Sequence, residues 1–320
     1  MKNDNKRRAV LAFHPCVGNS DGFHEPARTD IMRTDAPPPP NLHQAYANIR
    51  EQCDAAAGAW PQADKMRAHC HQDASGQWQP PAFSDGDGPI GCYAMLAQNS
   101  AAMGVLQLCR SAFERGLLHK VRAALDESQH ESYEQLLFIP EERTWHTCIA
   151  VFHEHPSLLD EATRPKWRRV VGDEAKKVGS AVAARTSSMG GARLTLDSLC
   201  ICADGALVAG FVDDEQGRAA ALRDACAQAG ADALGGELTS RPKKLLHVTL
   251  GRLLGAPDGL RPEQAEAIAT AVRTFHATPL HEQLGTAEPQ GFELRSVSLM
   301  RDSVWWMTVA EELATWQLSS

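Results

Sequence analysis

Apolar and polar positions along the chain change character near residue 90. From that point short apolar runs alternate with stretches in which apolar residues recur every three or four positions, the pattern of strands and amphipathic helices in turn. Strands are predicted at 91–97, 144–152 and 245–253, and residues 136–139 form a further apolar run before Pro140. Helices are predicted from an N-cap at Ser100 to Phe113, at 117–125, at 219–229 before Gly230, and from Pro262 with Ile268, Val272 and Phe275 on one stripe.

Two hairpins are also predicted. Residues 194–213 contain Asp204-Gly205, a pair typical of a type I′ turn. Residues 292–300 and 304–309 form the second hairpin, with Arg301-Asp302-Ser303 between them. Strands, helices and hairpins together indicate an α+β fold with antiparallel or mixed sheets flanked by helices. The order strand, helix, histidine-bearing strand occurs at 91–152, and a similar order recurs at 194–253.

The first part of the chain has a different composition. Of the 18 prolines in the 320 residues, ten lie before residue 90, and four of these form the run Pro37–Pro40. Few residues here are Leu, Ile, Val or Phe, a composition typical of segments that do not fold alone. One helix is predicted at 41–59, with Ala45, Ile49 and Cys53 at four-residue steps. We therefore predict a loosely ordered extension at 1–88 and a folded domain at 89–320.

Composition narrows the functional classes. A net charge of -8 disfavours a general nucleic-acid coat or a polybasic membrane anchor. No apolar run approaches the roughly 18–20 residues of a membrane-spanning helix. Nine cysteines, an odd count without a Cys-x-x-Cys pair, favour reduced thiols. We expect a soluble, cytoplasmic protein, a monomer that does not bind membranes.

Two predicted strands carry the candidate chemistry. In a strand, residues i and i+2 project to the same side, so His146 shares a side with Cys148, and His247 shares one with Thr249. Two such strands side by side would supply the groups for metal-free phosphodiester cleavage. One neutral histidine would accept a proton and one protonated histidine would donate one. The hydroxyl would hold the phosphate oxygens.

These segments resemble the two-histidine (2H) phosphoesterase superfamily, which includes 2′-5′ RNA ligase-like proteins and cyclic nucleotide phosphodiesterases. Its signature is two copies of His-x-Thr/Ser-x on facing strands. His247-Val248-Thr249-Leu250 fits it fully, whereas the segment from Trp145 to Ile149 has Cys148 in the hydroxyl position. The segment from Leu294 to Trp306 is similar to the last strands of the family, and the resemblance covers roughly residues 88–311.

The resemblance implies a bilobed, pseudo-symmetric fold and a reaction without metal or cofactor. The implied substrate is a nucleotide or RNA-end phosphodiester: a 2′,3′-cyclic phosphate, a 2′-5′ linkage or a related bond. His146 and His247 would act as general base and acid, and Thr249 and, more weakly, Cys148 would hold the phosphoryl oxygens.

Three further residues are candidates for substrate binding. Trp145 could stack on a base, although such residues more often pack in a core. Lys244 follows Arg241 and Lys243 and could steer a polyanion. Arg295 could reach the phosphate. His153-Glu154-His155 has the residue types of metal ligands but no second set of matching spacing. His69-Cys70-His71 lies in the N-terminal extension, so no metal site is predicted.

Three alternatives stay open at this point. A thiol is a weak hydrogen-bond donor, so a protein with Cys148 could bind nucleotides or RNA ends without turnover. Cys148 could instead act as a nucleophile with His146 as its base. The chain could also be an interaction protein that acts through residues 1–88.

Overall fold

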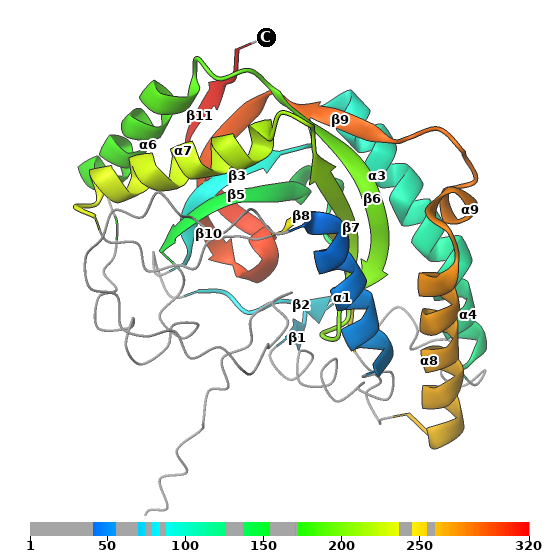
Figure 1. Ribbon diagram of the computed structural model, residues 1–320. Helices are drawn as coiled ribbons and strands as arrows, with labels where there is room; N and C mark the ends of the chain where they lie inside the picture. The colour runs from blue at the N-terminus through cyan, green and yellow to red at the C-terminus, as the bar shows by residue number, and fades with distance from the viewer. Residues whose placement is uncertain are drawn as a thin grey trace, which may run out of the picture.

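The computed structural model contains two antiparallel sheets with helices packed around them (Figure 1). It describes residues 41–55, 70–74, 78–83, 88–125, 137–153, 170, 172–236, 245–254 and 260–319. The predicted α+β class, with antiparallel sheets flanked by helices, is confirmed.

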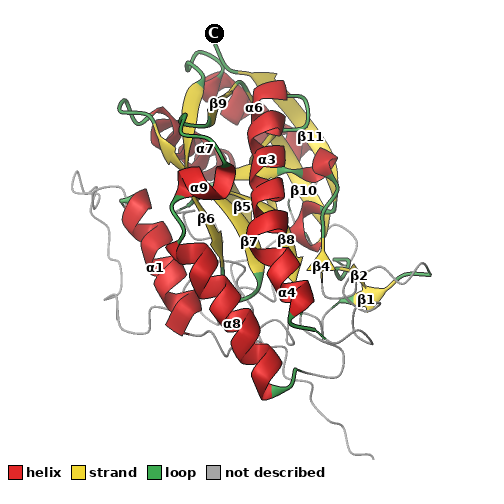
Figure 2. Ribbon diagram, turned by 90° about the vertical axis from the view of Figure 1, so that its right-hand side faces the viewer, coloured by secondary structure: helices red, strands yellow, loops and turns green. Residues whose placement is uncertain are grey.

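Helices pack against both sheets. The α-helices are α1 (Leu42–Ala55), α3 (Ser100–Phe113), α4 (His119–Ala123), α6 (Gly172–Thr186), α7 (Arg218–Ala233), α8 (Pro262–Ala277) and α9 (Leu280–Leu284). A π-helical turn, η1 (Glu114–Leu118), joins α3 to α4, and 3-10 turns occur at η3 (Glu142–Thr144) and η6 (Trp305–Met307). Figure 2 shows α3, α4, α8 and α1 along one side of the molecule.

The first sheet has the strand order β11-β10-β3-β5, and the second has the order β4-β8-β7-β6-β9. The strands of the first sheet are β3 (Ile90–Met95), β5 (His146–His153), β10 (Ser296–Val304) and β11 (Val309–Gln317). Those of the second are β4 (Leu137–Phe138), β6 (Ala192–Ile201), β7 (Ala206–Asp213), β8 (Leu246–Leu253) and β9 (Gly291–Leu294). A separate hairpin pairs β1 (His71–Gln72) with β2 (Trp78–Gln79). Each sheet therefore contains one of the two histidine-bearing strands, β5 or β8.

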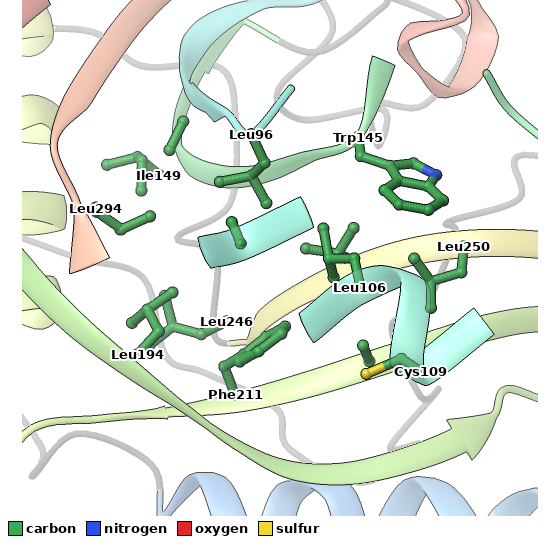
Figure 3. Close-up of a cluster of buried hydrophobic side chains, with 14 of the residues drawn as sticks. Leu96, Leu106, Cys109, Trp145, Ile149, Leu194, Phe211, Leu246, Leu250 and Leu294 are labelled. Atoms are coloured by element: carbon green, nitrogen blue, oxygen red, sulfur yellow. The ribbon is translucent and has the colours of Figure 1, made fainter. Parts of the chain in front are cut away.

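One continuous hydrophobic core lies between the two sheets. Helix α3, which follows β3 of the first sheet, packs against β7 and β9 of the second, and α7, which follows β7, packs against β5 of the first. Figure 3 shows Leu106 and Cys109 of α3 among side chains from both sheets. The predicted internal repeat is present as β3–α3–β5 and β7–α7–β8, and the exchange of helices joins the two halves into one core.

Two predicted helix ends differ from the structure. Asn99, rather than Ser100, caps α3, because its side chain accepts a hydrogen bond from the amide of Ala102 at 3.1 Å. Helix α7 does not end at Gly230 but continues to Ala233. A Cβ atom at position 230 would lie 2.4 Å from the ring of Phe152, so this glycine permits close helix–sheet packing rather than a helix stop.

The first predicted hairpin is confirmed as β6–β7, but its turn is not of type I′. That turn requires positive φ at both central residues. Gly205 has φ of 85°, and Asp204 is not among the residues with positive φ. The amide of Gly205 donates to the carbonyl of Cys202 and the amide of Cys202 donates to the carbonyl of Ala206, both at 2.9 Å, so the loop is one residue longer than predicted.

The closing hairpin is also displaced. Strand β9 pairs with β6 in the second sheet, and the chain then crosses at Arg295 to the first sheet, where β10 pairs with β3 and β11. The predicted turn residues 301–303 lie inside β10, and the turn occurs at η6, where Trp306 has φ of 66° and Met307 has φ of 59°. The carboxylate of buried Asp302 stabilises this turn by accepting a hydrogen bond from the amide of Met307 at 3.2 Å.

The described parts of residues 1–88 include α1 and the β1–β2 hairpin. The helix predicted at 41–59 is confirmed over Leu42–Ala55, and it packs against β6, β7 and α8. The proline run at 37–40 lies outside the described residues. Within the parts of the chain that the structure describes, no helix combines the length and the apolar character needed to cross a bilayer.

Candidate functional site

The two histidine-bearing strands show the predicted alternation of exposure. In β5, His146 and Cys148 are half-buried, whereas Thr147 between them is fully buried. In β8, His247 and Thr249 are half-buried, whereas Val248 is fully buried. Each histidine therefore shares the accessible side of its strand with the predicted donor residue.

The buried sides of β5 and β8 contribute to one core. Figure 3 shows a common group of apolar side chains that includes Trp145, just before β5, Ile149 of β5, and Leu246 and Leu250 of β8. Strands β5 and β8 are in contact where the two sheets meet. Because their buried sides face a common core, the half-buried side of each strand faces away from that core. We refer to the four half-buried residues of these two adjoining strands, His146, Cys148, His247 and Thr249, as the two-histidine face.

Arg223 of α7 joins the two strands at this junction. Its guanidinium donates to the backbone carbonyl of Cys148 in β5 at 2.9 Å and to the carbonyl of Leu245, just before β8. Burial lowers the pKa of Arg223 from its ordinary value. The helix that carries it is anchored by Asp213, whose carboxylate accepts hydrogen bonds from the amides of Ala219 and Ala220 at 2.9 and 2.8 Å. Arg223 thus links the backbone of the strand that carries His146 to the backbone next to His247.

The environment of His146 favours one tautomer and the neutral ring. Nδ1 lies 2.8 Å from the carbonyl oxygen of Thr144, so Nδ1 carries the proton and Nε2 has the free lone pair. Burial lowers the pKa of His146 below 6.5, and this hydrogen bond opposes the shift. The ring of Tyr93 contacts the imidazole edge to face, with centroids 5.4 Å apart and an interplanar angle of 85°. This arrangement suits a proton acceptor near neutral pH.

The neighbours of His247 and Thr249 on β7 are Gly210 and Val208, which pair directly opposite them. A Cβ atom at position 210 would lie 2.6 Å from the ring of Tyr46 in α1, so that ring fills the space beside His247. Tyr46 is fully buried. The helix was predicted from the sequence, but a role for Tyr46 was not, because the residues of the helix do not indicate which strand it packs against.

Arg252, a buried cation, lies further along β8. Arg252 pairs opposite Ala206, and Thr249 pairs opposite Val208, with a bulge between the two pairs. Since Ala206 and Val208 are two positions apart on β7, Arg252 lies on the same side of the sheet as Thr249. Its guanidinium contacts the carboxylate of Asp204 at 2.7 Å and lies 4.6 Å from the ring centroid of Trp306. With 2% of its side chain exposed, Arg252 is neutralised within the protein and is not available to a phosphate.

The other three predicted binding residues are Trp145, Arg295 and Lys244. Trp145 is 1% exposed and packs in the core, so its ring offers no surface to a base. The side chain of Arg295 is 75% exposed, pairs with Glu293 at 3.1 Å and lines a cavity of about 360 Å³ between the start of α3 and the β9–β10 crossing. Lys244, with Arg241 and Lys243, lies outside the described residues.

The metal-ligand patterns considered from the sequence are only partly described. His153 is buried at the end of β5, whereas Glu154, His155 and His69 fall outside the described residues. Among the residues that are described, no three His, Cys, Asp or Glu side chains are grouped closely enough to hold a metal ion.

Comparisons with known proteins add little to this geometry. No protein-family profile matches the sequence, and no curated protein matches it. Among solved structures, the chain is similar to E. coli LigT in complex with NADP+, with a TM-score of 0.39 and 13% sequence identity over 73% of this chain and 99% of that one. A TM-score below about 0.5 does not establish a shared fold, so the function proposed below depends on the site itself.

Proposed function

We propose that this protein is a phosphodiesterase of the two-histidine type. The observation that supports the proposal is the two-histidine face, where each of two adjoining strands distant in sequence has an imidazole and a small side chain half-buried on the side away from a shared core. The proposed substrate is a nucleotide or RNA-end phosphodiester, namely a 2′,3′-cyclic phosphate, a 2′-5′ linkage or a related bond. We propose that the chain acts as a cytoplasmic monomer.

In the proposed reaction His146 is the general base and His247 the general acid. Nε2 of neutral His146 takes a proton from a water molecule, whose oxygen attacks the phosphorus. Protonated His247 gives its proton to the ribose oxygen as the bond between that oxygen and phosphorus breaks. Proton transfers of this kind contribute about 10²–10⁴-fold each. For a cyclic phosphate the product is a phosphomonoester on the same ribose.

Thr249 and Cys148 flank the phosphate in this proposal. The Thr249 hydroxyl donates a hydrogen bond to a non-bridging oxygen and stabilises the charge that develops there. Cys148 holds the equivalent position beside His146, but a thiol donates more weakly. The two imidazoles supply both proton transfers, so the proposed mechanism requires no metal ion or cofactor.

Hydrolysis of 2′,3′-cyclic AMP in excess chelator tests the proposal. We expect turnover by the unmodified chain and a loss of at least about 100-fold in His146→Ala and in His247→Ala. The matched control is His281→Ala, which changes a histidine in α9 that is 62% exposed. Activity that chelator abolishes, or that survives both substitutions, would contradict the mechanism.

The thiol at position 148 favours one alternative, a protein that binds nucleotides or RNA ends without turnover. The same experiment separates the two. Saturable binding of adenosine 2′-phosphate that requires His247, together with absent hydrolysis of the cyclic compound, would support the binding protein over the enzyme.

A further inference from the structure

Helix α1 covers the part of the second sheet that adjoins the two-histidine face. Residues directly opposite in an antiparallel pair project to the same side, so Gly210 and Val208 of β7 lie beside His247 and Thr249 on one surface. The core-facing side of this sheet is occupied by α3, as Figure 3 shows for Leu106 near Phe211. Helix α1 lies against the other side, in front of β7 in Figure 1.

Both β7 neighbours of the candidate site are covered by α1 side chains. The Tyr46 ring occupies the space where Gly210 has no side chain. Ile49, one turn along the helix, packs against the cluster formed by Cys200, Cys202, Ala206 and Val208. A ligand bound to His247 and Thr249 therefore meets α1 as soon as it extends over β7.

The helix is held in this position along its length. The Tyr46 hydroxyl accepts a hydrogen bond from the amide of Phe211 at 3.1 Å and lies near the carbonyls of Phe211 and Leu246, to one of which it donates. At the start of the helix, His43 contacts the carboxylate of Asp197. At its end, Asp54 contacts Nδ1 of His276 in α8 at 2.8 Å.

We propose that α1, fixed by Tyr46, determines substrate size by closing the second-sheet side of the two-histidine face. This inference rests on the proposed function. A phosphate held between the two histidines carries substituents on either side, and α1 leaves no room for an extended one over β7 and β6. The chain therefore accepts a small cyclic nucleotide and discriminates against a cyclic phosphate at the end of an RNA strand that would cross this surface.

The test compares 2′,3′-cyclic AMP with an adenosine trinucleotide that ends in a 2′,3′-cyclic phosphate. We expect kcat/KM of the unmodified chain to favour the mononucleotide by about tenfold or more. Tyr46→Ala, which removes the ring and loosens α1, should reduce this ratio to near unity by raising kcat/KM for the trinucleotide. Tyr46→Phe keeps the ring and should retain the ratio, as should the control Gln52→Ala at an exposed position of the same helix.

A second variant and a binding measurement complete the test. If Tyr46→Ala does not fold, the milder Ile49→Ser replaces it, and the ratio of kcat/KM for the mononucleotide to that for the trinucleotide should likewise fall. The affinities for adenosine 2′-phosphate and for the trinucleotide ending in a 2′-phosphate are measured in parallel. Their ratio reports selection by ligand size even if the chain has no turnover and the proposed function fails. Equal affinity and turnover for short and long ligands in the unmodified chain, or a ratio unchanged when α1 is loosened, would overturn the inference.

Discussion

The guanidinium of Arg223 donates a hydrogen bond to the backbone carbonyl of Cys148 at 2.9 Å and also donates to the carbonyl of Leu245. These carbonyls belong to residues two positions from His146 and His247, on separate sheets. The spacing of the two imidazoles is therefore coupled to one half-buried side chain of α7.

We predict that Arg223→Met lowers kcat by about 10–100-fold, because small displacements of catalytic groups have effects of this size. The protein should also lose stability, since each buried carbonyl left without a donor costs about 1–3 kcal/mol. Arg223→Lys should recover part of kcat. The measurements are steady-state kinetics and urea unfolding.

Arg185→Met is the control, because Arg185 and its partner Asp232 are both about half exposed. Equal kcat in the Arg223 and Arg185 variants would exclude the positioning role.

Cys148→Thr should raise kcat by about two- to tenfold, the range expected when a weak donor is replaced by a hydroxyl. The side chain is half-buried and packs against the apolar cluster of Tyr93, Val151, Met300 and Met307. Cys148→Val has the shape of threonine without the hydroxyl, so it should not raise kcat. If the threonine and valine variants behave alike, position 148 does not contact the phosphate.

The pH dependence follows from the environment of His146. The base must be neutral, and burial lowers the pKa of His146 below 6.5. Activity should therefore persist as the pH falls to 6.5 and be lost only below it, as the ring becomes protonated. We expect the acid limb of kcat/KM to disappear in His146→Ala, with a large loss of rate, and to remain in His281→Ala. An acid limb above about pH 7 would contradict the assignment of His146 as the base.

The contact between Gly210 and Tyr46 can be measured by a double-mutant cycle. Gly210→Ala places a methyl group 2.6 Å from the Tyr46 ring and should cost about 1–3 kcal/mol in the free energy of unfolding. In the Tyr46→Ala background the same substitution should cost much less, because the space is then vacant. Gly104→Ala, where an added Cβ atom meets nothing within 4 Å, is the control. Additive costs would show that α1 does not dock beside His247 in solution.

The residues that share a side within each histidine-bearing strand were predictable because strand alternation is a local property. The pairs His146 with Cys148 and His247 with Thr249 follow from a two-residue period, and both strands are as predicted to within a few residues. The hairpin β6–β7 and the helix opened by Pro262 likewise follow from local turn and capping chemistry.

Features that depend on contacts distant in sequence were not predictable. Arg223 reaches Cys148 across 75 residues, and nothing in the helix around it distinguishes it from a surface cation. Tyr46 was missed for the same reason. The apolar run from Phe292 to Met300 does not reveal that the chain changes sheets at Arg295, because strands of both sheets bury the same residue types.

In the proposed reaction His146 and His247 bind the same phosphate. A titration of the 15N-histidine-labelled protein with adenosine 2′-phosphate, in chelator, tests this shared binding, with the two imidazoles assigned from the His146→Ala and His247→Ala variants. We predict that both resonances shift along one binding curve with one ligand per chain, while His281 does not respond. If only one of the two imidazoles shifts, or if they follow different curves, the two histidines do not form a common site.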